Sequence, residues 1–413
     1  MNNFHLVGEE LWCENVALPS IARDVGTPAY IYSKASIVNN LELLMGAFES
    51  LNVQICFSVK SNSNLSILRL MADRGIGADI VSGGELFRAL KAGIDPKKIV
   101  YSGVGKTAPE IHYALKSGIG IFNVESEAEL HAISDIAKAM DTIASISLRV
   151  NPDIDAKTHA FTTTAKKENK FGLPLCAAAD LYAAAHSLPH ISPVGIDVHL
   201  GSPILSLDPY RRALELLSDL YGRLHAMGIK VHTIDIGGGF GIVYKDETPF
   251  TPIQFAAILA PYAERLKCNF VVEPGRFVVG NAGVLLTTVT YVKKTPSKLF
   301  YICDAGMNDL IRPPLYDAYH AVVPVMQRKA ADQTIADIVG PVCESSDFFG
   351  KHRTIDRVAQ GELLAVRSAG AYGFSMASNY NSRPRPCEIL VDGSSYSVIR
   401  KRESYDDLIR GEA

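Results

Sequence analysis

Eight short runs of β-branched and apolar residues alternate with helical patterns, and this alternation constrains the fold more than any other feature. The runs are VQICFSV (53–59), GADIVS (77–82), KIVYSG (98–103), IGIFNV (119–124), SISLRV (145–150), VGIDVH (194–199), VHTIDI (231–236) and FVVE (270–273). Between them, apolar residues recur at three- and four-residue spacing, as at 84–93, 127–140 and 208–228. Parallel strands need helical crossovers and bury both faces. We therefore expect a parallel (β/α)8 barrel, with a doubly wound open sheet as the alternative.

The pattern changes after about residue 276, where strand signals follow one another with little helix between them. These strands are expected at 284–292, 298–303, 362–367, 387–391 and 396–399, and an early strand at 28–33 could pair with them. We expect residues 1–27 to join a β-domain, residues 28–275 to form the barrel, and residues 276–413 to form a C-terminal β-sandwich or β-barrel domain. The region 304–350, rich in Gly, Pro, Asp and Arg, is expected to be irregular and to carry function.

Charge and cysteine content narrow the class of protein. The 413 residues carry 41 basic and 44 acidic side chains, so the net charge of −3 creates no field that favours nucleic acid or anionic lipid. No apolar stretch approaches the roughly 18 residues of a membrane span, and the first fifteen residues lack the pattern of a secretory signal. Seven scattered cysteines without a CxxC pair argue against disulfides or a structural zinc site. We expect a cytoplasmic protein that binds no metal, membrane or nucleic acid.

Chemically useful residues follow four of the predicted barrel strands, at the ends where barrel enzymes place their active sites. Lys60 follows the first strand, HLGS (199–202) the sixth, GGGFG (237–241) the seventh and EPGR (273–276) the eighth. Each signal alone has an ordinary explanation, namely a solvated lysine, a structural histidine, a tight turn and a surface salt bridge. Together they provide an amine that can form an imine, an imidazole, a glycine loop that admits a phosphate, and an acid. Pyridoxal 5′-phosphate (PLP) requires this combination.

Further motifs carry a resemblance over nearly the whole chain. They are FSVKSNSN (57–64), VSGGEL (81–86), VNPDIDAKTH (150–159), KENKFG (167–172), RPPLYDAYH (312–320), GPVCESSD (340–347) and GAYGFSMASNYNSRPRP (370–386). With the strand-end motifs, the chain resembles the fold-type III PLP-dependent decarboxylases, and most closely the branch that acts on diaminopimelate. The resemblance implies an alanine racemase-like fold, in which a PLP-binding barrel precedes a β-rich domain. It also implies decarboxylation of meso-2,6-diaminopimelate to L-lysine and CO2, the last step of lysine biosynthesis.

The same resemblance implies a role for individual residues. Lys60 would bond to the cofactor aldehyde, His199 would stack on its ring, and Glu273 would pair with the pyridine nitrogen. The phosphate would be surrounded by Ser202, Gly238, Gly239, Gly241, Gly275, Arg276 and Tyr372. The substrate would be held by Arg276, Arg312, Tyr316, Glu344 and Tyr372. Cys343 and Glu344 would come from the second subunit of a homodimer.

Elementary chemistry agrees with these roles. Decarboxylation leaves a carbanion, which a protonated pyridine stabilises, so an acid beside the ring nitrogen is required. The carbanion must then be protonated, and Cys343 lies in a polar loop where its thiol can serve as the acid, whereas Cys56 and Cys303 lie in strands and fit a structural role. The planar fork of an arginine suits a substrate carboxylate.

The chain departs from the family pattern at two positions, and rival functions stay open. Pro203 replaces a residue that would offer a backbone donor near the phosphate, and Ala160 stands in the 153–172 loop where relatives often carry proline. One rival is a decarboxylase of the ornithine or arginine type, although such enzymes typically carry aspartate where this chain has Glu344. A decarboxylase that acts on another amino acid in a secondary pathway is a second rival, and a non-catalytic PLP carrier is a third.

Overall fold

The computed structural model describes residues 3–155, 170–328 and 332–413, and the contacts within the chain divide it into two compact units. The barrel unit comprises Glu42–Gly241 and Thr248–Gly275. The β unit comprises Met1–Leu41, Ile242–Glu247 and Arg276–Ala413. The short insertion Ile242–Glu247 therefore interrupts the barrel unit in sequence and belongs to the β unit.

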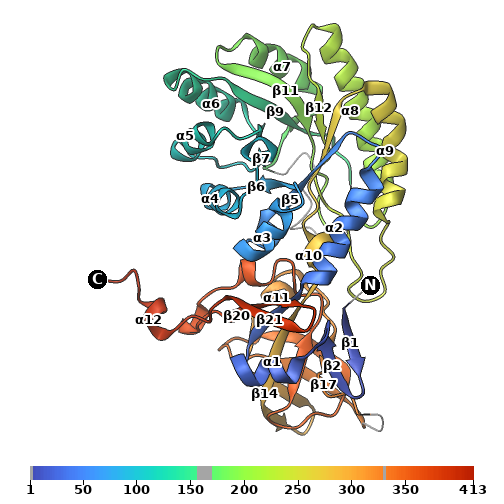
Figure 1. The fold of residues 1–413 in the computed structure, drawn as a ribbon, viewed down its shortest axis with the longest axis vertical. Helices are drawn as coiled ribbons and strands as arrows, with labels where there is room; N and C mark the ends of the chain where they lie inside the picture. Colours follow the sequence, from blue (N-terminus) through green and yellow to red (C-terminus); the bar gives the residue numbers. More distant parts are fainter. Residues whose placement is uncertain (1–2, 156–169, 329–331) are drawn as a thin grey trace. The chain divides into compact units, whose positions relative to one another are not determined.

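In the described part of the barrel unit, eight parallel strands close into a barrel (Figure 1). They are β5 (Val53–Ser58), β6 (Gly77–Ile80), β7 (Ile99–Tyr101), β8 (Ile121–Val124), β9 (Ala144–Asn151), β11 (Ile191–Asp197), β12 (Thr233–Asp235) and β13 (Asn269–Val272). Each strand pairs with the next, and β13 pairs with β5 to complete the ring, while the short β10 (Leu173–Pro174) extends β9. Every predicted run forms one of these strands. The closure confirms the (β/α)8 barrel and excludes the open sheet.

Helices connect successive barrel strands. They are α3 (Leu65–Ala72), α4 (Gly83–Ala92), α5 (Ala108–Ser117), α6 (Glu127–Ala139), α7 (Ala178–Ser187), α8 (Asp208–Ala226) and α9 (Pro252–Leu266), while α2 (Lys34–Phe48) precedes the first barrel strand. Local sequence explains their ends: the side chains of Ser82 and Ser126 accept the backbone N–H three residues later, as N-caps do. Gly93 and Gly118 end α4 and α5 in the left-handed conformation that glycine adopts without strain.

An aromatic cluster fixes one end of the barrel. Tyr210 of α8 packs edge-to-face on Phe250 and on Phe255 of α9, with ring centroids 5.6 and 4.9 Å apart. The ring of Tyr210 is fully buried, and its hydroxyl donates a 2.7 Å hydrogen bond to the carbonyl oxygen of Gly238. The glycine loop that follows β12 is therefore held by the packing of two barrel helices.

The β unit is built on a mixed sheet in the order β18-β17-β15-β14-β4-β20-β21, with β19 on β14 and β16 on β19. The strands are β4 (Ala29–Ser33), β14 (Gly283–Lys294), β15 (Leu299–Cys303), β16 (Val322–Pro324), β17 (Gln333–Val339), β18 (Phe348–Asp356), β19 (Leu363–Val366), β20 (Cys387–Asp392) and β21 (Ser395–Arg400). A separate small sheet contains β1 (Phe4–Val7), β2 (Glu10–Cys13) and β3 (Val16–Ala17). The helices are α1 (Leu18–Val25), α10 (Arg276–Val279), α11 (Arg312–Tyr316) and α12 (Tyr405–Leu408). As predicted, the early strand β4 pairs with later ones, β14 and β20.

The expectation of an irregular region at 304–350 was partly wrong. This region contains α11, β16, β17 and the start of β18. β17 pairs in parallel with β15 and in antiparallel fashion with β18, so its partners on one side come from more than thirty residues earlier in the chain. A strand stabilised by such distant pairing gives only a weak local signal. Among the described helices, none combines the length and the apolar character that a membrane crossing requires.

Candidate active site

Lys60 lies in a short 3-10 turn, Val59–Ser61, that follows β5 at the carboxyl end of the barrel. Its Nζ donates a 2.7 Å hydrogen bond to Oδ2 of Asp79, the third residue of β6, whose side chain is fully buried. The same carboxylate oxygen accepts a 2.7 Å hydrogen bond from Ser58. The side chain of Lys60 is 32% exposed. The amine is therefore oriented by a buried acid and remains accessible from outside the barrel.

His199 follows β11 and lies beside the glycine loop. Its Nδ1 accepts a 3.3 Å hydrogen bond from the backbone N–H of Gly238, and a ring nitrogen that accepts carries no proton. Burial, with the positive charges of Arg149 and Lys60, lowers the pKa of His199 well below its usual value. His199 is thus a neutral imidazole, and its 3.8 Å approach to Glu273 is not an ion pair.

Three buried acids converge beneath these residues. Asp197 ends β11, Asp235 ends β12 and Glu273 follows β13, and one oxygen from each lies within 4.8 Å of the others. Burial first, and the negative charges of neighbouring acids second, raise the pKa of Glu273 and of Asp197 well above their ordinary values. Burial also raises the pKa of Asp235, to about 6. The site therefore disfavours the ionised forms of Glu273 and Asp197, whereas Asp235 is largely ionised at pH 7.

One oxygen of Glu273 has no partner. Its Oε1 is buried and makes no hydrogen bond with any described residue, and the side chain is only 3% exposed. A buried carboxyl oxygen without a hydrogen bond destabilises the folded protein, so its presence here requires an explanation. A cationic or N–H group placed against this oxygen would satisfy it.

The glycine loop approaches neighbouring backbone too closely for any other residue type. A Cβ on Gly238 would lie 2.2 Å from the carbonyl oxygen of Glu273, and one on Gly239 would lie 2.5 Å from that of Gly201. The loop also pairs with the segment that carries Ser202, because the N–H of Ile204 donates to the carbonyl oxygen of Gly239 at 2.7 Å. The barrel unit thus brings together the strand-end residues that the sequence predicted, which are Lys60, His199, Ser202, Gly238, Gly239, Gly241, Glu273 and Gly275.

The β unit holds the predicted substrate-binding arginines. Arg276 begins α10 and Arg312 begins α11, and both guanidinium groups are buried. Each donates a hydrogen bond from Nη1 to the hydroxyl oxygen of Tyr244, at 2.7 and 2.8 Å respectively. Arg276 also lies 4.9 Å from the ring centroid of Tyr372. Tyr316 ends α11, so Arg312 and Tyr316 share one short helix.

Cys343 and Glu344 lie on an exposed loop between β17 and β18. The backbone N–H of Cys343 donates to Oδ1 of Asn381 at 3.0 Å, and Glu344 accepts hydrogen bonds from Tyr380 and Ser346. These two donors lower the pKa of Glu344, which is therefore a carboxylate at neutral pH. In contrast, Cys56 and Cys303 are buried, as expected for structural cysteines.

Comparison with known proteins places this geometry in a family. Residues 34–280 match the model described as "Pyridoxal-dependent decarboxylase, pyridoxal binding domain". The chain is 47% identical over 402 residues to a diaminopimelate decarboxylase of Aquifex aeolicus, covering 97% of this chain and 95% of that protein. The chain belongs to the diaminopimelate decarboxylase family.

Solved structures of this family have the same fold. The Helicobacter pylori diaminopimelate decarboxylase complexed with L-lysine matches with a TM-score of 0.92 at 42% identity, covering 95% of this chain and 98% of that one. The M. jannaschii enzyme in co-complex with L-lysine matches with a TM-score of 0.95 at 35% identity, covering 100% of this chain and 98% of that one. The fold-type III architecture predicted from the sequence is therefore confirmed.

The residues of the barrel unit fit the cofactor that the family's pyridoxal-binding domain implies. The unpartnered Oε1 of Glu273 is suited to a protonated ring nitrogen, and Lys60 offers a positioned amine. A loop of glycines also exposes the backbone N–H groups that a phosphate can accept from.

Sequence reasoning missed several of the residues described above in each unit. Asp79, Arg149, Asp197 and Asp235 lie at or near the carboxyl ends of apolar barrel strands, and Tyr244 lies in the insertion after the glycine loop. An ionisable residue near the end of a buried strand by itself indicates a candidate functional residue, because burial of a lone charge is unfavourable. Nothing local marks Tyr244, because only the fold brings it to the two arginines. The departure at Ala160 and most of the 153–172 loop lie outside the described residues.

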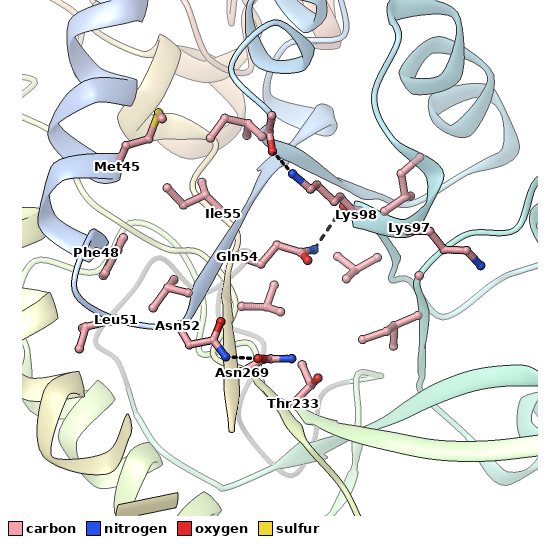
Figure 2. A pocket seen from close by; sticks show the side chains of 18 of the residues that line it. Met45, Phe48, Leu51, Asn52, Gln54, Ile55, Lys97, Lys98, Thr233 and Asn269 are labelled. Atoms are coloured by element: carbon pink, nitrogen blue, oxygen red, sulfur yellow. Dashed lines mark hydrogen bonds between the residues drawn. The ribbon is translucent and has the colours of Figure 1, made fainter. Parts of the chain in front are cut away.

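A cavity of about 500 Å³ lies at the opposite end of the barrel (Figure 2). Its lining includes Val53, Ile99, Thr233 and Asn269, which are the first residues of their strands. One lining lysine already contacts backbone, because Nζ of Lys98 donates to the carbonyl oxygen of Gly75 at 2.8 Å. The amino ends of barrel strands commonly serve stability, and this cavity is remote in the barrel from the residues described above.

Proposed function

We propose that this chain decarboxylates meso-2,6-diaminopimelate to L-lysine and CO2, using PLP bonded to Lys60. The observation that carries the proposal is the combination at the carboxyl end of the barrel of an oriented amine, Lys60 on Asp79, with the unpartnered buried acid Glu273. Identity of 47% to a diaminopimelate decarboxylase over nearly the whole chain supports the choice of substrate.

When bound, PLP supplies an electron-withdrawing ring that accepts the electron pair released as the substrate loses CO2. Glu273 would hold the ring nitrogen in its protonated form, because a protonated nitrogen would satisfy the buried Oε1. Neutral His199 would lie beside the ring without adding a charge that competes with that nitrogen. Asp79 orients the Lys60 amine, which would bond to the cofactor, through the 2.7 Å hydrogen bond.

Recognition of the substrate uses both of its ends. Arg276 and Arg312 bind carboxylate through their guanidinium groups, with Tyr372 and Tyr316 beside them. The ionised Glu344 binds the distal ammonium. A substrate that carries both an amine and a carboxylate at its far end satisfies this set, whereas ornithine and arginine lack the distal carboxylate.

Cys343 protonates the α-carbon after CO2 has left, so that one proton replaces the lost carboxylate. Its thiol is exposed on the β unit of a single chain, as expected of a group that serves a partner's site. We therefore infer a homodimer in which Cys343 and Glu344 complete the site of the other subunit. We also infer a cytoplasmic location and an organisation into a PLP-binding barrel and a β-rich domain, which the N-terminal segment joins.

The test measures CO2 release from meso-diaminopimelate, L-lysine, ornithine and arginine by the purified holoenzyme. Release from meso-diaminopimelate alone is expected, and release from ornithine alone would overturn the substrate assignment. Reduction with borohydride followed by peptide mapping should recover the cofactor on Lys60. Recovery on another lysine would refute the assignment of the amine.

A further inference from the structure

Tyr244 joins the two arginines of the β unit through a single atom. Its hydroxyl oxygen accepts Nη1 of Arg276 at 2.7 Å and Nη1 of Arg312 at 2.8 Å. The two guanidinium groups come from different helices, α10 and α11, which are separated by more than thirty residues of chain. Tyr244 comes from a third segment, the insertion Ile242–Glu247. One phenol oxygen therefore sets the spacing of two charged groups that the backbone alone does not connect.

The charges explain why such a bridge is needed. Two buried cations repel each other, and an oxygen that accepts from both reduces this repulsion. Both contacts that the Tyr244 hydroxyl makes among the described residues are with arginine donors, and arginine cannot accept a hydrogen bond. The two positive charges lower the pKa of Tyr244 although its burial acts in the opposite direction. The two arginines thus favour negative charge on the phenol oxygen that accepts from both of them.

A buried histidine fixes the other side of one arginine. Nη1 of Arg312 also lies 3.1 Å from Nε2 of His320, whose Nδ1 contacts the carbonyl oxygen of Arg367 at 2.8 Å. Burial, followed by the charge of Arg312, lowers the pKa of His320 to about 3, so the ring is neutral. A neutral ring that donates from Nδ1 to a carbonyl must accept at Nε2. Arg312 is therefore held between two acceptors, Tyr244 and His320.

We propose that Tyr244 is a positioning residue for substrate specificity, whose hydroxyl holds Arg276 and Arg312 as a pair that binds the distal carboxylate of the substrate. This inference rests on the proposed function, which assigns both arginines to the substrate. A ligand with a carboxylate at that end gains from the paired guanidinium groups, and a diamine does not. Without the hydroxyl, the two cations separate and the pair loses its spacing. Tyr244 itself need not contact the reacting atoms.

The test compares Tyr244→Phe with a matched control, Tyr319→Phe, in the holoenzyme. The control removes a hydroxyl from a half-buried tyrosine of the same unit whose ring lies against Arg353, 4.0 Å away. For Tyr244→Phe, KM for meso-diaminopimelate should rise about tenfold, which corresponds to about 1.4 kcal/mol of binding free energy, while kcat changes little. The dissociation constant of L-lysine, measured by calorimetry, should rise by a similar factor. The control should leave both constants unchanged.

A second comparison separates failure of this inference from failure of the proposed function. Arg312→Lys should also raise KM, and the double variant with Tyr244→Phe should show less than the product of the two single effects, because both changes disrupt one interaction. If Arg312→Lys raises KM and Tyr244→Phe does not, the inference is wrong and the function stands. The inference is equally wrong if the effects multiply, or if Tyr244→Phe lowers kcat with KM unchanged. If Arg312→Lys changes neither KM nor kcat, Arg312 does not bind the substrate. The inference about Tyr244 and the assignment of Arg312 in the proposed function are then both wrong.

Discussion

Replacement of Glu273 by glutamine should change stability and activity in opposite directions. In protein freed of cofactor, Glu273 is a buried acid with an unpartnered oxygen, surrounded by Asp235, Asp79 and Asp197. Burial and these like charges raise its pKa well above 4.5, so the folded protein disfavours the ionised form of this acid. Glutamine has nearly the same shape and is neutral without taking up a proton.

The size of the change in the free energy of unfolding follows from the proton that the folded chain must hold on Glu273. In the unfolded chain the carboxyl ionises with a pKa of about 4.5. Keeping it protonated costs about 1.36 kcal/mol for each pH unit above that value, up to the pKa of the folded protein. Because the folded pKa lies above the unfolded one, this cost is absent below about pH 4.5 and grows as pH rises. Glu273→Gln removes it, so the stability gained by the variant should be almost nothing at pH 4.5 and should grow by about 1.36 kcal/mol for each pH unit above it, up to the pKa of the folded protein.

Urea unfolding of the cofactor-free proteins at several pH values measures this difference, with Glu127→Gln, an exposed change on α6, as the control. The holoenzyme should behave in the opposite way, with kcat reduced about a hundredfold or more because the amide cannot stabilise a protonated ring nitrogen. If wild type and Glu273→Gln keep a constant stability difference from pH 4.5 to 7, the reasoning about the buried acid is refuted.

Three further predictions concern the rest of the site. Glu344→Gln should lower kcat/KM for meso-diaminopimelate about tenfold or more, since it removes the charged partner of the distal ammonium; unchanged steady-state kinetics would contradict this role. Inactive Lys60→Ala and Cys343→Ala chains, unfolded together and refolded, should recover about a quarter of wild-type activity, because half the dimers are mixed and each mixed dimer has one intact site. No recovery in a sample shown to contain mixed dimers would exclude a shared site. Gly238→Ala should reduce retention of PLP on dialysis, followed by absorbance, because the new Cβ would lie 2.2 Å from the carbonyl oxygen of Glu273; full retention would show that the loop can move.

The sequence alone was sufficient for the barrel and for the residues directly after its strands. Each barrel strand is a short apolar run, and each crossover helix has its own apolar face and caps, so the information is local. Lys60 and the glycine loop were found because they follow directly on such runs. The strand β17 was missed because its stability comes from pairing with β15 and β18, which no local pattern records.

Only the tertiary structure decided which charged groups meet. Asp197, Asp235 and Glu273 are separated by nearly forty residues each in the chain, and they converge because β11, β12 and β13 are neighbours in the closed barrel. Tyr244 follows the glycine loop in sequence, yet its segment belongs to the β unit, where it meets Arg276 and Arg312. Chain order cannot encode these encounters, because electrostatic and hydrogen-bond partners are set by distances in space that arise only once strands and helices have packed.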